Sequence, residues 1–447
     1  MIRIVSLGAA LTAACILPVW AQDATQPTPT ERWNLYYQAT SIGQYHGTFN
    51  SPYEDQFSLQ DYAERDVSLT STLFLGFNLG HDTQFYFDPE IAGGRGFSSV
   101  DGLANPPNGE LPRVAGATPK PYVARAYISH DFGFGDEREN VESDANQLGG
   151  TRPKKRLTVI AGRFTLTDFF DNNRYTHDPR TQFMEWGVMF NGAWDYPADT
   201  RGYTWALYSE FHSESWSFRW AMAAEPSVAN GGRFDRRLFR DHGNTFEAER
   251  RFSVRTHPGA LRLLNFVNRT RSGSYGEALQ VAAATGSRPD VTAIRRPGTL
   301  KYGFGVNAEQ EITRDLGVFM RLGWADGKNE DFAFTAIDRI ANAGVSLSGA
   351  RWHRKGDTIA TSYAASGLSA VHALYLARGG YDFLIGDGRL NYAPEYTWES
   401  YYSAQLPMGF AIAFDAQHYA NPAYNHDRGP LWAYSIRIHV EGKAGTR

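Results

Sequence analysis

Residues 204–222, TWALYSEFHSESWSFRWAM, contain the pattern that decides the fold. The first half alternates between two sets, Trp205, Leu207, Ser209 and Phe211 against Thr204, Ala206, Tyr208, Glu210 and His212. The second half does the same with Trp216, Phe218, Trp220 and Met222 against Ser217, Arg219 and Ala221. A period of two residues places successive side chains on opposite faces of a β-strand. The stretch therefore predicts strands with one apolar and one polar face.

The same alternation recurs along the chain, for example at 301–311, 390–399 and 432–440. Between Trp33 and Val440 we count roughly sixteen to eighteen such segments, and an even number is expected of a bacterial barrel. A soluble β-sandwich also alternates, but its strands are usually about 5–6 residues long. Many segments here reach about nine residues, the length that a tilted strand needs to cross a bilayer. We therefore predict an all-β fold, a transmembrane antiparallel barrel of sixteen strands, with eighteen as the alternative.

The composition is consistent with a large β-structure. The chain has 447 residues, of which 42% are hydrophobic, 14% aromatic and 21% charged. That is too apolar for a disordered chain and too polar for a bundle of membrane helices. The net charge of −4 argues against a nucleic-acid partner.

The first 21 residues have the features of a secretory signal peptide. Arg3 precedes an uncharged, mostly apolar run that Pro18 ends, and Val19 and Ala21 supply small residues for cleavage after Ala21. The run is shorter than the ~20 residues that span a bilayer. The single Cys, Cys15, lies in this segment, so we expect a mature chain without disulfides or thiolate metal sites. We also expect no cofactor and no resident metal.

We expect three parts after the signal peptide. Residues 22–32 form a short periplasmic tail, 33–441 a single barrel with long loops, and 442–447 an unpatterned tail. The longest expected loops are Ala92–Lys120, Thr167–Gln182, Ser272–Pro297 and Ala364–Gly388. Gly135–Lys155 and Glu225–Gly243 disturb the expected alternation of short turns and long loops. Either they are long inner turns or a strand is missed, and the sidedness stays open.

Several blocks resemble the carbohydrate-selective porins of the OprB type. The most specific is Asn421–Trp432, NPAYNHDRGPLW, and Asp387–Glu395 precedes it. The stretch from Gly162 through Asp168-Phe169-Phe170-Asp171-Asn172-Asn173 to Trp194 is also similar, as is Trp33–Gly47. The resemblance spans nearly the whole mature chain. It implies a sixteen-stranded outer-membrane barrel that passes sugars by diffusion.

The C-terminus departs from this family. Its members are similar in ending on an aromatic residue, which the assembly machinery uses. Here Gly442 stands where Phe would be expected, and residues 442–447 continue without an alternating pattern.

The polar face of the strands supplies the candidate sugar contacts. Sugar hydroxyls pair with planar groups such as guanidinium and carboxylate, and sugar ring faces lie against aromatic rings. In 122–128 the alternation places Arg125 and Tyr127 on the face opposite Tyr122 and Ala124. By the same register Arg163 faces inward. The substrate-pathway candidates are Arg125, Tyr127, Arg163, Tyr208, Glu210, Arg113, Glu395 and Glu399, with Arg113 in a loop that would narrow the pore if it folds inward.

Other readings of the chain remain open. Asp168, Asp171 and Asp178 could bind Ca²⁺, but an ordinary polar loop fits the spacing better. We find no metalloprotease, Walker or nucleophile-elbow motif. The predicted function is passive, sugar-selective diffusion, with small sugars and outer-membrane lipid as partners and a homo-oligomer compatible with the fold. The alternatives are a general or organic-acid porin, an outer-membrane carbohydrate hydrolase, and a role in polysaccharide export.

Overall fold

The computed structural model describes residues 29–111, 116–237, 240–333 and 336–446. The expected signal peptide and Arg113 lie outside these residues. Within them, sixteen antiparallel strands close into one barrel, and two more form a separate hairpin, β5–β6. The predicted class and the choice of sixteen strands are therefore confirmed. The barrel strands are β1 (Trp33–His46), β2 (Glu64–Gly80), β3 (Thr83–Gly94), β4 (Lys120–Gly133), β7 (Arg156–Phe164), β8 (Thr204–His212), β9 (Trp216–Ala224), β10 (His242–Val254), β11 (His257–Ser272), β12 (Arg296–Thr313), β13 (Leu316–Ala325), β14 (Arg339–Ser348), β15 (Thr358–Gly367), β16 (Glu395–Gln405), β17 (Phe410–Ala420) and β18 (Leu431–Thr446).

The remaining elements lie in the connections. The hairpin consists of β5 (Arg138–Val141) and β6 (Gly150–Pro153). The helices are α2 (Trp186–Met189), α3 (Tyr275–Thr285) and α4 (Ala370–Ala377), with short 3-10 turns η1 (Phe97–Val100), η2 (Leu166–Asp168), η3 (Thr292–Ile294), η4 (Gly349–Trp352), η5 (Pro407–Gly409) and η6 (Pro422–Tyr424). None of the helices in the described part of the chain is long and apolar enough to cross a membrane.

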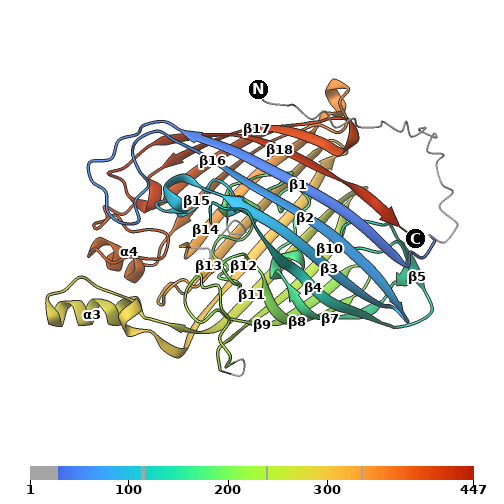
Figure 1. The fold of residues 1–447 in the computed structure, drawn as a ribbon, viewed down its shortest axis with the longest axis horizontal. Coiled ribbons are helices and arrows are strands. Elements are labelled where there is room, and N and C mark those ends of the chain that lie inside the picture. The colour runs from blue at the N-terminus through green and yellow to red at the C-terminus, as the bar shows by residue number, and fades with distance from the viewer. Residues whose placement is uncertain (1–28, 112–115, 238–239, 334–335, 447) are drawn as a thin grey trace, which may run out of the picture.

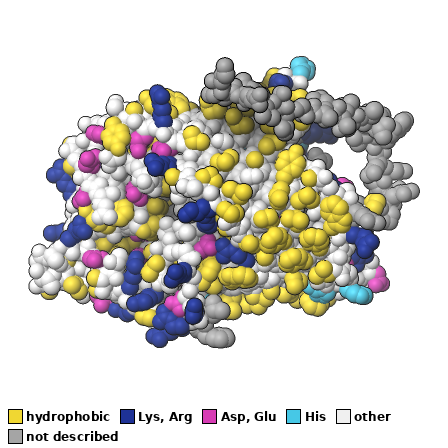
Figure 2. Space-filling model, in the orientation of Figure 1, with side chains coloured by type: hydrophobic (Ala, Val, Ile, Leu, Met, Phe, Trp, Pro, Cys, Tyr) yellow, Lys and Arg dark blue, Asp and Glu magenta, His cyan; other side chains and the backbone are white. Residues whose placement is uncertain are grey.

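The alternation sorts side chains between two environments. Trp205 and Phe218 point outward and are 53% and 51% exposed, whereas Thr204 and Ser217 on the same strands point inward and are buried. Figure 2 shows hydrophobic side chains gathered over the strands and charged ones mostly toward the long-loop end. An apolar outer band around polar inward faces is the arrangement of an outer-membrane barrel.

Eight connections, the longest among them, lie at one end of the barrel, where α3 and α4 project (Figure 1). The opposite end has the short turns and both ends of the sheet, with Trp33 at the start of β1 and Thr446 at the end of β18. Residues 225–241 lie at the long-loop end, so they fit the alternation of short turns and long loops. Residues 134–155 are a long turn at the short-turn end, because they carry the β5–β6 hairpin. Short turns face the periplasm in such barrels, so the long loops are extracellular.

Two expected boundaries are wrong. The last strand does not end at Glu441: β18 continues through 442–446 and pairs with β1 up to Thr446 opposite Asn34. This part of the strand lies beyond the apolar band, so its residues are small or polar and show no alternating pattern in the sequence. In the other case β16 begins at Glu395, and residues 390–394, which alternate in the sequence, lie in the preceding loop.

Candidate functional site

Two extracellular loops fold into the lumen. The β3–β4 loop (95–119) and the β7–β8 loop (165–203) contribute a large share of the buried residues, including Ala104, Phe170 and Trp194. The sequence left open whether the β3–β4 loop folds inward, and its described residues do so. A barrel of this size has a wide lumen, and these loops fill much of it.

Glu395 and Glu399 face the lumen, as predicted, but the loops cover both. Glu395 accepts hydrogen bonds from the backbone N–H groups of Ala104 (3.1 Å) and Asn105 (2.9 Å). Glu399 accepts bonds from the N–H groups of Met184 (2.6 Å) and Glu185 (3.1 Å). These carboxylates satisfy backbone donors that would otherwise be buried without partners, so they hold the loops in place.

Arg321 and Arg437 hold the β7–β8 loop from the same side of the wall. Arg321 is fully buried, donates to the carbonyls of Val188 (2.8 Å) and Thr176 (2.8 Å), and pairs with Asp171 (2.9 Å). Arg437 donates to the carbonyls at 179 (2.8 Å) and 182 (2.6 Å). Their inward register is visible in the sequence, but their attachment to a loop is not.

Two cavities lie along the barrel. One of about 720 Å³ opens at the long-loop end and is lined by Arg95, Trp186 and Phe383, among others. The other, of about 520 Å³, lies at the short-turn end against the β5–β6 turn. It is lined by three of the predicted residues, Tyr127, Tyr208 and Glu210.

Arg125 lies on β4 between Tyr127, which lines the short-turn cavity, and Ala117, which precedes the strand and lines the long-loop cavity. Its Nε and Nη2 donate to the two oxygens of Asp168 (2.7 and 2.6 Å), and its Nη1 donates to Asp88 (3.2 Å). Asp88 also accepts a bond from Asn146 (2.8 Å), which lines the short-turn cavity. The Arg125 guanidinium stands 5.5 Å from the Tyr203 ring centre. Two carboxylates, Asp88 on the wall and Asp168 on the inserted loop, thus fix a planar donor group between the wall and that loop.

A β-bulge at Ala124 corrects the predicted register of β4. Asp88 pairs with Arg125 and Pro89 with Val123, so Ala124 has no partner on β3. The extra residue returns Tyr122 to the lumen face, where its hydroxyl donates to Glu90. Arg125 and Tyr127 face inward as predicted, but Tyr122 does so too, because a bulge shifts the alternation by one residue.

The prediction that Arg163 faces the lumen is wrong in register. Arg163 pairs across the sheet with Trp205, whose side chain points outward. The alternation on β7 instead turns Phe164, which is fully buried, inward. The Arg163 guanidinium donates to the Val123 carbonyl (2.9 Å) and the Asp199 carboxylate (2.6 Å), so it ties wall to loop.

Aromatic rings connect the two cavities. At the short-turn end, Phe169 stacks on Tyr208 with ring centres 4.5 Å apart, and Tyr127 lies 5.1 Å from Tyr86. A chain of ring contacts leads from there toward the long-loop cavity. The distances between successive ring centres are 5.6 Å from Tyr208 to Phe170, 6.0 Å from Phe170 to Trp194, 5.2 Å from Trp194 to Tyr196 and 6.4 Å from Tyr196 to Trp186. Tyr127 and Tyr208 were predicted, whereas the loop residues Phe169 and Trp194 entered only through the family resemblance.

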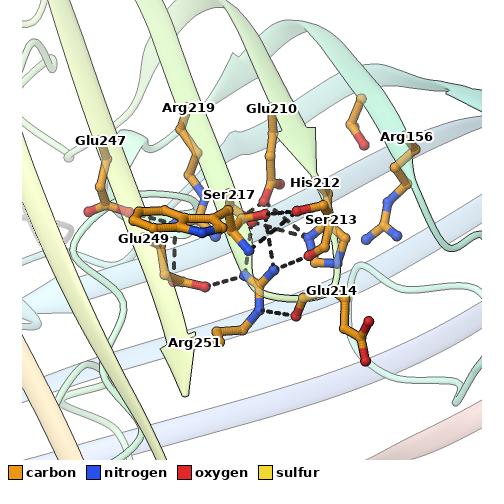
Figure 3. Close-up of polar contacts among 12 residues, drawn as sticks. Arg156, Glu210, His212, Ser213, Glu214, Ser217, Arg219, Glu247, Glu249 and Arg251 are labelled. Atoms are coloured by element: carbon orange, nitrogen blue, oxygen red, sulfur yellow. Dashed lines mark hydrogen bonds and ion pairs between the residues drawn. The ribbon is translucent and has the colours of Figure 1, made fainter. Parts of the chain in front are cut away.

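Glu210 begins a row of alternating charges across the sheet (Figure 3). Arg219 pairs with Glu210 (3.2 Å), Glu247 (2.6 Å) and Glu249 (3.2 Å). Arg262 continues the row by pairing with Glu249 (2.7 Å). Each arginine is flanked by acids on neighbouring strands, which keeps the wall rigid and free of strong positive charge.

The described residues contain one group with the spacing of a metal site, Asp331, Asp338 and His372 in the extracellular loops. Lys301 pairs with Asp331 and lies 3.1 Å from Asp195, and His372 lies 3.1 Å from Asp338. Each of these carboxylates thus has a basic partner, so the group is a buried ion cluster. Two of the candidate Ca²⁺ ligands also form ion pairs, Asp168 with Arg125 and Asp171 with Arg321.

Comparison with known proteins agrees with this architecture. The profile of the carbohydrate-selective porin family, OprB family, matches residues 66–441. The high-pH structure of Pseudomonas putida OprB is similar, with a TM-score of 0.68, 17% identity, and coverage of 92% of this chain and 94% of that one. OccAB1 of Acinetobacter baumannii gives a TM-score of 0.50 at 10% identity, covering 93% and 98%. No curated protein sequence matches the chain.

Proposed function

The chain belongs to the carbohydrate-selective porins of the OprB family and is a sugar-selective diffusion channel of the bacterial outer membrane, and on this basis we propose which residues select the sugar. Monosaccharides or small oligosaccharides pass from the long-loop cavity to the short-turn cavity, crossing beside Arg125 and along the aromatic rings. The observation that carries this proposal is the position of Arg125, between residues that line the two cavities and next to a row of rings.

The chemistry of the passage matches that of sugars. Phe169, which is stacked on the buried Tyr208 ring, provides apolar surface for the C–H faces of a pyranose ring. Arg125 and Glu210 provide planar donors and acceptors at its rim. Because these charged groups are already paired, they exchange hydrogen bonds with a solute without holding it tightly. Weak binding is what a channel requires for release.

The same pairing disfavours the organic-acid alternative. Asp88 and Asp168 neutralise Arg125, and glutamates flank Arg219 and Arg262. An anion entering this lumen would meet compensated arginines and nearby carboxylates, whereas a neutral sugar would not be repelled. A pore for organic acids needs an excess of positive charge at its narrow part. The paired charges therefore support neutral solutes.

The experiment that tests this proposal is swelling of liposomes that contain the purified protein. We expect glucose and short neutral oligosaccharides to enter faster than sugar acids of equal size, with protein-free liposomes as the control. Equal rates for glucose and gluconate would contradict the proposed selectivity. Faster gluconate would favour the organic-acid porin.

We also propose that the apolar band contacts outer-membrane lipid. Outward residues such as Phe218, Leu263 and Ile436 form this band around the sheet. A homo-oligomer would cover part of it, and the mass of the protein in detergent would distinguish one copy from three.

A further inference from the structure

Besides the two cavities along the barrel, another pocket opens on the extracellular surface, outside the lumen. Its volume is about 340 Å³, within the range of small-molecule sites. Four loops that are far apart in sequence build it. They are the β1–β2 loop with Phe57, the β11–β12 loop with Arg288 and Arg295, the β13–β14 loop with Glu330, and the β15–β16 loop with Tyr381 and Phe383. The loops meet where β1–β2 and β15–β16 also share a backbone bridge between Phe57 and Gly386.

The lining combines aromatic rings with planar charged groups. Phe57 meets Tyr381 edge to face at 5.4 Å between ring centres. Arg288 lies over the Tyr381 ring, 3.8 Å from its centre. On the other side Arg295 and Glu330 form a two-pronged ion pair, with Nε 2.8 Å from the carboxylate. Apolar ring surface beside fixed donors and acceptors suits a carbohydrate.

Buried contacts hold the pocket in shape. The Tyr375 hydroxyl donates to the carbonyl of Tyr381 (2.9 Å) and accepts from the N–H of Val291 (3.1 Å). Asp382 accepts a bond from Tyr275 (3.2 Å) and lies 3.3 Å from the His372 ring. The ion cluster at His372 therefore holds Asp382, which lines the pocket, in place. A site that is rigid before binding loses less entropy when it binds.

The pocket lies beside the channel entrance. Phe383 lines both this pocket and the long-loop cavity, and so forms the wall between them. The next residue, Leu384, accepts a backbone bond from Gly102 (2.8 Å) in the β3–β4 loop that enters the lumen. A solute that leaves the pocket past Phe383 therefore enters the long-loop cavity.

We propose that this pocket is a carbohydrate-binding site that captures a neutral mono- or disaccharide at the cell surface and delivers it to the channel. The inference rests on the proposed function, because capture helps only if the solute then crosses. Capture raises the local concentration of sugar at one mouth of the channel. It should increase the association rate from the extracellular side and leave the rate from the periplasmic side unaffected.

The test is the association rate of glucose or maltose, measured from blocking events in single-channel current with sugar on one side of the bilayer at a time. Tyr381→Ala is expected to lower the rate about five-fold from one side only, since loss of an aromatic contact costs about 1 kcal/mol. Tyr381→Phe keeps the ring and should restore most of the rate. Tyr62→Ala, an exposed tyrosine on the β1–β2 loop that does not line the pocket, is the matched control.

The outcomes separate this inference from the proposed function. Equal rates in Tyr381→Ala and the unchanged protein, or an equal reduction from both sides, would overturn the capture site and leave the channel intact. A variant that slows gluconate but not glucose would assign the pocket to anions and would also overturn it. No sugar block from either side in the unchanged protein would overturn the proposed function and this inference together.

Discussion

The two sides of the lumen wall contain the same kinds of polar residue but use them differently. On β13–β18, Arg321, Glu399 and Arg437 bond the backbone of the β7–β8 loop. On β4 and β8, Arg125, Tyr127 and Tyr208 contact other side chains. One side bonds the backbone of the inserted loop, whereas the other meets the side chains of Asp168 and Phe169 on the same loop, next to the short-turn cavity.

This difference shows that an inward charge is not by itself a solute contact. Arg321 and Arg125 have the same side chain and the same orientation relative to the sheet. Arg321 is occupied by loop carbonyls, which no solute can displace without unfolding the loop. Arg125 is occupied by two carboxylates, Asp88 on the wall and Asp168 on the inserted loop. The partner, rather than the residue type, determines the role.

Removing Arg321 should have the largest effect on the loop-holding side. Arg321→Ala leaves buried carbonyls and the Asp171 carboxylate without their partner, a loss of roughly 3–5 kcal/mol. The β7–β8 loop should detach, so conductance should rise and sugar selectivity fall. Conductance and thermal unfolding check this, with Arg269→Ala on the outer face as control. Unchanged conductance and stability would show that the loop does not depend on this side.

The ion cluster at His372 extends loop holding to the extracellular surface. Burial would lower the pKa of His372, but Asp338, Asp382 and Asp331 outweigh it and raise the pKa to about 10. Because the pKa of His372 is raised in the folded state, its protonation stabilises the folded loops fully at pH values below the ordinary pKa of about 6.5. This stabilisation is lost as the pH rises through about 10. Between about pH 6 and pH 8 the free energy that stabilises the folded loops should therefore fall by about 2 kcal/mol.

Hydrogen exchange of α4 and the residues after it measures this loss. Exchange corrected for its intrinsic pH dependence should quicken between pH 6 and 8 in the unchanged protein. In His372→Gln it should be fast at both values, because the titrating group is gone. A pH-dependent step of the same size in His372→Gln would place the titration elsewhere.

Replacing Arg125 sharpens the comparison on the solute-facing side. Arg125→Ala should weaken sugar binding about ten-fold, since a charged hydrogen bond contributes roughly 1.5 kcal/mol. The barrel should still fold but with lower stability, because Asp88 is left buried without its counter-ion. Arg125→Lys keeps the charge but loses the two-pronged pairing with Asp168, so most of the loss should remain. Glucose block titrations of the three proteins provide the affinities. Wild-type affinity in Arg125→Ala would remove this residue from the site.

The smallest effect is expected at the aromatic rings. Tyr208→Ala removes the partner of Phe169 and should weaken sugar binding by about 1 kcal/mol, a few-fold in affinity. Tyr208→Phe should retain the ring contact, and Tyr363→Ala, which points to the outer face, serves as control. If both alanine variants weaken binding equally, ring stacking in the lumen is not the cause.

Local pattern was enough to predict the barrel, because the period of two residues records which side of each strand meets lipid. It failed at the Ala124 bulge, where a single residue shifts that period, and at Arg163, where the inward face of β7 was assigned to the wrong set of residues. It also missed the polar end of β18, which lies beyond the apolar band. Inward residues such as Arg125 and Glu395 could be predicted. Their roles could not, because a loop almost 300 residues away in sequence covers Glu395.

The central claim is that paired charges and rings on the β4–β8 side select neutral sugars. Its most direct test is single-channel current in a planar bilayer, titrated with glucose and, separately, with gluconate. We predict that glucose blocks the current in a saturable way and that gluconate blocks weakly or not at all. A current unaffected by glucose, or blocked more strongly by gluconate, would contradict the account.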